Sequence, residues 1–221
     1  MPTKQPEREG AEARRKRARS LYRKLTGLYP DAHCELDYKN PFQLLIATIL
    51  SAQCTDVRVN MVTPELFKRY STPEKLGRAK QEDVEKVIHS TGFYRNKAKS
   101  LIASSNDIAT TFSGKVPDSM DDLLSLRGVA RKTANVLLGN AYGINEGVVV
   151  DTHVNRLANR MGLTGHQNPV KIERDLMQLF PRKNWTLLSH VLIWHGRRHC
   201  KARNPDCQNC PLQKQCPKVN V

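Results

Sequence analysis

The chain has 221 residues, 39% of them hydrophobic, so it is long enough to bury a core of its own. Its 36 lysines and arginines against 21 aspartates and glutamates give a net charge of +15, which is typical of proteins that bind a polyanion, although ribosomal and membrane-surface proteins share this balance. No hydrophobic run reaches the roughly 20 residues that span a bilayer, and the N-terminus lacks the hydrophobic core of a secretory signal, so the sequence predicts a soluble protein of a reducing compartment.

Residues 1–20 are predicted to form a basic, disordered extension, of which residues 1–13 are polar and loose. The stretch from Arg14 to Lys24 holds seven basic residues and no acidic one. Within it, Arg14-Arg15-Lys16-Arg17 is compatible with a nuclear signal, but a disordered basic tail is the favoured interpretation. Residues 197–203 add four basic residues, and the two basic runs are expected to be neighbours if the chain ends pack together.

The remaining pattern predicts an all-α protein. Residues 42–50 are hydrophobic nearly all round, which predicts a buried helix capped by Asn40 and Pro41, with Cys54 expected as a buried thiol in a hydrophobic helix. Ser119 and Asp122 resemble a capping box. The valines at 148–150 are too few to found a sheet. Further helices are expected over residues 15–28, 55–70, 81–90, 95–112, 119–124, 131–141, 154–161, 169–179 and 185–195.

A glycine turn opens directly into a helix at Leu126-Arg127-Gly128-Val129-Ala130-Arg131-Lys132-Thr133-Ala134-Asn135. The N-terminus of a helix presents backbone N–H groups and the positive end of a dipole, so this turn predicts a phosphate-binding cradle. Lys132 lies just inside the helix, where positive potential disfavours its charged form and favours a nucleophilic amine. A solvated surface lysine is the alternative.

Asp151 follows the hydrophobic run 148–150 and precedes Thr152 and His153. A carboxylate near an amine is suited to accept a proton or to support a developing cation. The competing interpretation is structural, because aspartate in this position is a favoured helix N-cap.

Four cysteines lie in the last 22 residues, in the spacing C-x6-C-x2-C-x5-C. Four thiolates suit either a zinc ion or a cubane iron–sulfur cluster, and the ligand type does not separate the two. Zinc ribbons usually have two C-x2-C pairs, whereas this chain has one. Disulfides are the third possibility. The four residues are Cys200, Cys207, Cys210 and Cys216.

Together these motifs resemble the endonuclease III family, bifunctional DNA glycosylases that excise oxidised pyrimidines. The resemblance runs over roughly 200 residues. It implies that Lys132 attacks the sugar carbon bearing the damaged base, that Asp151 assists, and that a Schiff base leads to β-elimination of the 3′ phosphate. It also implies that the four cysteines hold a [4Fe–4S] cluster.

The family fold implied by the resemblance has two lobes: a six-helix barrel over residues 34–144, with a helix-hairpin-helix at about 119–141, and an iron–sulfur cluster lobe over residues 21–33 and 145–221. A third motif, residues 50–56, contains Gln53, which in the family enters the duplex where the damaged nucleotide has been extruded. Phe93 falls at a second wedge position, where the family commonly has an aliphatic residue.

The hairpin departs from the family form Leu-Pro-Gly-Val-Gly at two positions. Arg127 replaces the proline, and either supplies a compensating charge or lies outside the footprint. Ala130 replaces the second glycine and adds a methyl group where the backbone approaches phosphate. Gly128, the residue expected to need a positive φ, is kept. The candidate DNA-binding residues are Gln53, Phe93, Arg127, Gly128, Val129, Ala130, Arg131, Thr133 and His153.

We therefore expect a DNA glycosylase and AP lyase of base excision repair, acting as a monomer on double-stranded DNA with oxidised pyrimidines or abasic sites. A cytoplasmic location at the bacterial nucleoid is expected, with a nuclear one left open. Alternatives are a monofunctional mismatch or damage glycosylase of the same superfamily, against which Lys132 argues, a non-enzymatic DNA-binding module stapled by zinc, and an electron-transfer protein.

Overall fold

Several helices begin where the sequence provides a side chain that caps the first turn. In the computed structural model, which describes residues 9–221, Asn40 accepts a hydrogen bond from the N–H of Gln43, and Asn168 caps another helix in the same way. Ser119 accepts from the N–H of Asp122, as its resemblance to a capping box predicted. Proline follows both asparagines at the first helical position, where its missing N–H costs nothing.

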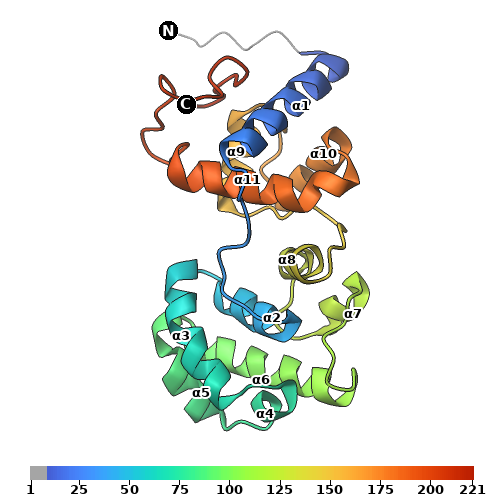
Figure 1. The fold of residues 1–221 in the computed structure, drawn as a ribbon, viewed down its shortest axis with the longest axis vertical. Helices are drawn as coiled ribbons and strands as arrows, with labels where there is room; N and C mark the ends of the chain where they lie inside the picture. The colour runs from blue at the N-terminus through green and yellow to red at the C-terminus, as the bar shows by residue number, and fades with distance from the viewer. Residues whose placement is uncertain (1–8) are drawn as a thin grey trace. The chain divides into compact units, whose positions relative to one another are not determined.

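The described residues form eleven α-helices and two short 3-10 helices and contain no strand (Figure 1), so the all-α prediction is confirmed. The elements are α1 (Ala11–Leu28), α2 (Pro41–Leu50), α3 (Asp56–Arg69), α4 (Pro73–Gly77), α5 (Gln81–Ile88), η1 (His89–Thr91), α6 (Tyr94–Thr110), α7 (Met120–Ser125), α8 (Arg131–Ala141), α9 (Thr152–Arg160), α10 (Pro169–Leu179), η2 (Arg182–Asn184) and α11 (Trp185–Arg198).

Two sequence-based expectations about order and burial are wrong. Helix α1 begins at Ala11, so residues 11–20 are helical and not disordered, and the helix expected over residues 15–28 is present but starts four residues earlier. Alanine, arginine and lysine favour helix, and Ala18, Leu21 and Leu25 bury one stripe of it. The expected loose residues 1–8 lie outside the described part. Cys54 lies in the turn between α2 and α3 and is only half-buried, because α2 already ends at Leu50.

The chain divides into two compact units, each with its own hydrophobic core. One unit consists of residues 9–33 and Gly147–Val221, and its core is formed by the buried faces of α1, α9, α10 and α11. The other, Cys34–Glu146, contains α2 to α8 around a core in which α2 is buried on nearly every side. Helix α4, five residues long, is an addition to the six helices expected there.

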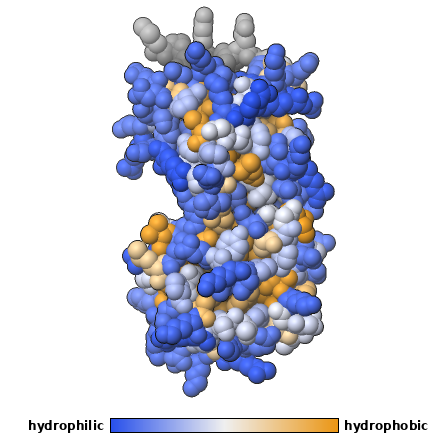
Figure 2. Space-filling view, viewed as in Figure 1, coloured by the Kyte–Doolittle hydropathy of each residue, from blue (hydrophilic) through white to orange (hydrophobic). Residues whose placement is uncertain are grey.

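The visible surface is mostly hydrophilic, with hydrophobic residues confined to patches (Figure 2). Among the described residues, no helix has both the length and the hydrophobicity needed to cross a bilayer. The basic run on α1 is largely exposed, although Arg17 forms an ion pair of 2.6 Å with Glu9 and donates to the carbonyl of Met161. Helix α1 packs against α11, so the two basic runs belong to one unit, and their direct proximity stays a prediction.

Candidate nucleic-acid interface and metal centre

The turn between α7 and α8 requires glycine at one position. Gly128 has φ +83°, and a Cβ added there would lie 2.8 Å from the Cβ of Ser100 on α6. The turn is closed by the N–H of Val129, which donates to the carbonyl of Leu126 over 3.2 Å. The expectation of a positive φ at Gly128 is therefore confirmed, and the close approach to α6 adds a second reason for glycine.

The N-terminus of α8 carries no capping side chain. Ala130 is the N-cap residue, with extended φ and ψ of −99° and 168°, and its methyl group accepts no hydrogen bond. The first-turn N–H groups of Lys132 and Thr133 are thus available to an external acceptor, which is the arrangement that binds phosphate. Lys132 is exposed beside them.

The predicted hairpin contacts differ in what they offer to a ligand. Arg127 is exposed on the turn. The guanidinium of Arg131 donates to the carbonyl of Glu146 over 3.4 Å, so part of its hydrogen-bonding capacity serves the fold. Val129 is 8% exposed and its N–H donates within the turn, so it anchors the hairpin to the core, and its contact with DNA stays a prediction.

Two residues predicted as DNA wedges, Gln53 and Phe93, line one cavity of about 260 Å³ together with Gly128. Both have left-handed backbone conformations, with φ of 53° and 48°. Six non-glycine residues among those described have positive φ, and these two share a cavity. Such strain is uncommon for an aromatic residue and is typical of functional loops. Phe93 remains 64% exposed.

The same cavity is lined by Lys97, a residue that the sequence analysis did not single out. Its side chain is 6% exposed, and its ammonium donates to the carbonyls of Leu50 and Thr91, both over 2.8 Å. Burial lowers the pKa of Lys97. With both carbonyls bound to its ammonium, Lys97 is a structural cation and not a second candidate nucleophile.

Asp151 caps α9, as its structural interpretation predicted: one carboxylate oxygen accepts from the N–H of Val154 over 2.8 Å. Two residues further on, Nδ1 of His153 lies 3.1 Å from the guanidinium of Arg156. Because a guanidinium can only donate, this contact favours a ring whose Nδ1 accepts. Burial lowers the pKa of His153, Asp151 opposes this shift, and Arg156 adds to it. The contact of His153 with DNA stays a prediction.

Lys132 belongs to the unit 34–146 and Asp151 to the other unit. Lys132 lies in the uncapped first turn of α8, and Asp151 is the N-cap residue of α9. Their pairing stays a prediction.

The four C-terminal cysteines gather after α11. All four are half-buried and free of disulfides, and three of them pack against the core of their unit. Burial raises the pKa of Cys216, and the thiols of Cys200, Cys210 and Cys207 raise it further, because each would place negative charge nearby. If all four thiols lose their protons, their negative charges repel one another, and a bound cation is needed to compensate that charge.

The four cysteine thiols form a donor set that fits a cubane iron–sulfur cluster, and the same donor set would also fit a zinc ion.

Two arginines one turn apart on α9 secure the cysteine loop, and the sequence analysis missed both. Arg156 donates to the carbonyls of Cys200 and Gly196, and Arg160 donates to the carbonyls of Lys201 and Ala202. Arg160 also lies 3.4 Å from the sulfur of Cys200. The spacing of four residues was visible in the sequence, but its partners 40 or more residues away were not.

Comparison with known proteins identifies this arrangement. Residues 46–182 match the model of the HhH-GPD superfamily of base excision DNA repair proteins, and residues 200–216 match the iron–sulfur binding domain of endonuclease III. Endonuclease III of Synechocystis is 52% identical over 95% of both chains. The chain belongs to the endonuclease III family. Endonuclease III of Bacillus subtilis is 43% identical, over 87% of this chain and 88% of its own.

Solved structures of the family share the fold. A non-covalent endonuclease III–DNA complex and a trapped endonuclease III–DNA covalent intermediate each match with a TM-score of 0.88 and 41% identity, over 92% of this chain and 95% or 96% of theirs. A thermostable thymine-DNA glycosylase, 20% identical with a TM-score of 0.80, shares the fold alone. The predicted family, helical fold and [4Fe–4S] cluster are confirmed, and the protein is a DNA glycosylase and AP lyase of base excision repair.

Proposed function

We propose that this glycosylase removes oxidised pyrimidines from double-stranded DNA, with Lys132 as nucleophile and Asp151 as assisting carboxylate. The observation that carries the proposal is the uncapped N-terminus of α8, where an exposed lysine lies beside backbone N–H groups suited to a phosphate. DNA as the partner is supported by the complexes of the 41%-identical relatives.

The proposed chemistry uses one amine in two steps. The Lys132 nitrogen bonds to the sugar carbon as the bond from that carbon to the damaged base breaks, and the departing base leaves with the electron pair. Asp151 stabilises the positive charge that develops on the sugar and takes the proton released by the amine. The lone pair of the bound nitrogen then breaks the bond from the same carbon to the ring oxygen, which takes up a proton, so the sugar ring opens to a Schiff base. The Schiff base acidifies the neighbouring carbon, and deprotonation of that carbon expels the 3′ phosphate by β-elimination.

The [4Fe–4S] cluster supplies no step in this scheme. Cys200, Cys207, Cys210 and Cys216 hold it, and it fixes the C-terminal loop, which carries exposed basic residues that suit the DNA backbone. We further propose that the protein acts as a monomer in the cytoplasm and also cleaves preformed abasic sites.

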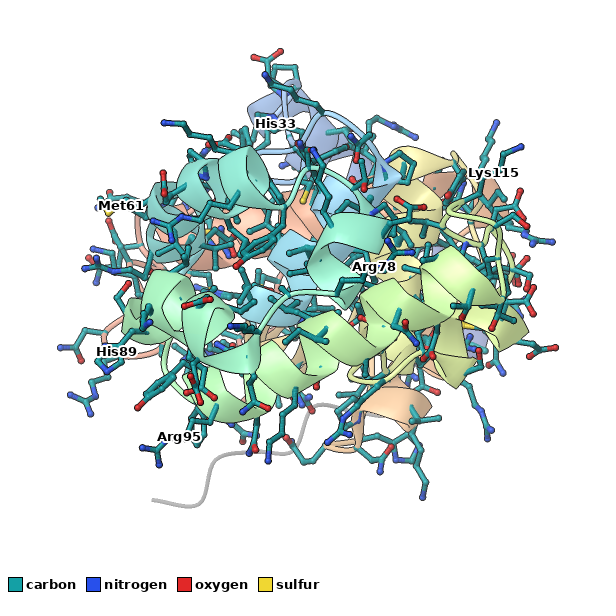
Figure 3. The ribbon with its side chains drawn as sticks, turned by 90° about the horizontal axis from the view of Figure 1, so that it is seen from below. His33, Met61, Arg78, His89, Arg95 and Lys115 are labelled. Carbon is teal, nitrogen blue, oxygen red and sulfur yellow. The ribbon has the colours of Figure 1, made fainter. Side chains whose placement is uncertain are left out.

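Borohydride trapping on a duplex with a single thymine glycol tests the nucleophile. Wild-type protein is expected to form a covalent adduct, and Lys132→Gln to form none while still binding the duplex. Lys115→Gln is a matched control, since Lys115 is an exposed lysine of the same unit whose side chain is directed outward (Figure 3). An undiminished adduct in Lys132→Gln would refute the assignment.

Asp151→Asn separates the carboxylate's chemistry from its capping role, because asparagine caps a helix as well as aspartate does. We expect slower base release, a smaller effect on cleavage of a preformed abasic site, and an unchanged melting temperature. Base release without any trapped adduct in the wild-type protein would instead support the monofunctional alternative.

A further inference from the structure

Lys97 joins the two loops that carry the proposed wedge residues. One ammonium donates to the carbonyl of Leu50, the last residue of α2, and to the carbonyl of Thr91, the last residue of η1, each over 2.8 Å. Gln53 lies three residues after the first carbonyl, and Phe93 lies two residues after the second.

The two hydrogen bonds from the Lys97 ammonium stabilise the structure in two separate ways. The carbonyls at the end of a helix have no partner within it, and a cation is the favoured group at that end of the helix dipole. In addition, both loops turn through left-handed residues, Gln53 and Phe93, which must be held by their surroundings because the conformation is costly for non-glycine residues. The backbone N–H of Lys97 also donates to the carbonyl of Phe93 over 3.0 Å.

The burial of Lys97 is selective along α6. Arg95, two residues earlier, directs its side chain outward from the ribbon (Figure 3), and Lys99, two residues later, is exposed. Lys97 is 6% exposed and lines the cavity that Gln53 and Phe93 also line. A buried ammonium is costly to desolvate, so its place between two loop ends indicates a role that a hydrophobic side chain would not fill.

We propose that Lys97 is a positioning residue that sets the spacing and conformation of the two wedge loops, and through them the insertion of Gln53 and Phe93 into the duplex. The proposal rests on the proposed function in that it assumes an extruded nucleotide. Lys97 does not touch the reacting atoms. Its loss leaves the chemistry of Lys132 intact but weakens the opening of a paired duplex.

The test compares the same abasic site in two settings: opposite adenine in a fully paired duplex, and inside a bubble of unpaired nucleotides where no wedge is needed. Single-turnover adduct formation is measured on both. Because misplacing a positioned group by about 1 Å can cost up to about 100-fold, we expect Lys97→Met to slow the duplex reaction by about 10- to 100-fold and to leave the bubble reaction within about twofold of wild type.

Lys99→Met removes an exposed lysine from the same helix and is expected to leave both rates unchanged. A merely structural role would lower both rates in proportion to the folded fraction, and an unchanged ratio of bubble to duplex rate in folded Lys97→Met overturns the proposal. If Lys97→Met does not fold, the ratio is measured on Lys97→Arg, whose donors are kept but placed in a longer, planar group.

A second readout does not depend on catalysis. With 2-aminopurine opposite a non-cleavable abasic analogue, wedge insertion unstacks the probe and raises its fluorescence. Wild type and Lys99→Met are expected to give the full rise, and Lys97→Met a reduced one; an equal rise refutes the role of Lys97. If wild type forms no adduct on either substrate, the proposed function fails, while this fluorescence still decides the role of Lys97.

Discussion

Ala130 precedes the uncapped first turn of α8, and a substitution there is expected to change protein stability and DNA affinity in opposite directions. It is an N-cap residue with an extended backbone and no capping hydrogen bond. Serine at an N-cap accepts from an N–H of the first turn and stabilises a protein by about 1 kcal/mol relative to alanine. If those N–H groups bind phosphate, the serine oxygen competes with DNA for them.

We therefore expect Ala130→Ser to be more stable and to bind more weakly. About 1 kcal/mol corresponds to a rise in melting temperature of roughly 2–4 °C for a chain of this size. The lost phosphate contact, on the scale of one modest hydrogen bond, weakens the Kd for an abasic-site analogue by about fivefold.

Ala130→Gly supplies the matched comparison, because it removes the methyl group without adding an acceptor. Inside a helix, glycine would cost up to about 1 kcal/mol. At an N-cap, glycine is preferred over alanine, and this gain is offset by the greater freedom of the unfolded chain, about 0.4–1 kcal/mol. We expect a melting temperature within about 2 °C of wild type and binding that is tighter by up to about 1 kcal/mol.

Thermal unfolding and fluorescence anisotropy on one abasic-analogue duplex measure both quantities. The reasoning is refuted if Ala130→Ser gains stability and binds as tightly as wild type, since the first-turn N–H groups would then not be the phosphate donors. A large loss of stability in Ala130→Gly would show that Ala130 does not act as an N-cap.

Three further outcomes follow from single contacts. Gly128→Ala is expected to lower the free energy of unfolding, measured in urea, by about 1–3 kcal/mol more than Gly143→Ala does. Both glycines have positive φ, but of the two only Gly128 would place an added Cβ within 4 Å of a neighbour. Equal losses of stability in the two variants would contradict the packing argument. The pKa of His153 is lowered in the folded protein, so protonation of His153 favours the unfolded chain, and the free energy of unfolding should fall as the pH drops below about 6.5. His153→Gln should reduce the dependence of the free energy of unfolding on pH in this range. An unchanged pH dependence would contradict the assignment to His153. Arg160→Met should release iron to a chelator faster than wild type, while Lys171→Met, at an exposed lysine, should not; equal release rates would show that the bonds from Arg160 to the loop are dispensable.

The sequence predicted those parts of the fold that depend on local signals. Helices α8 and α10 have the predicted bounds because a glycine turn and an Asn-Pro pair mark where they start. The five-residue α4 shows no periodicity and was missed. Cys54 was placed wrongly because nothing in the hydrophobic run of residues 42–50 indicates the left-handed turn at Gln53 that follows it.

Long-range contacts explain what could not be predicted in the candidate site. A lysine on a helix is normally solvated, and the partners that bury Lys97 include the carbonyl of Leu50, 47 residues away in the sequence. The arginines of α9 likewise find their carbonyls only once the cysteine loop has folded back. Motifs identified the chemistry, whereas the framework that supports it required the structure.

Two of the three non-glycine residues with positive φ in the unit 34–146, Gln53 and Phe93, lie where the proposed function needs them. Gln53, Phe93 and Gly128 all have positive φ, and all three line one cavity, although they come from loops far apart in the sequence. A left-handed residue stays so only when its surroundings determine it. Lys97 fixes the ends that lead into two of these loops, and the packing of Gly128 against Ser100 fixes the third. A surface that must open a duplex has to hold its side chains out without a hydrophobic core beneath them. Buried hydrogen bonds and close backbone packing provide that support here, and replacing Lys97 should therefore affect duplex opening before it affects the amine of Lys132.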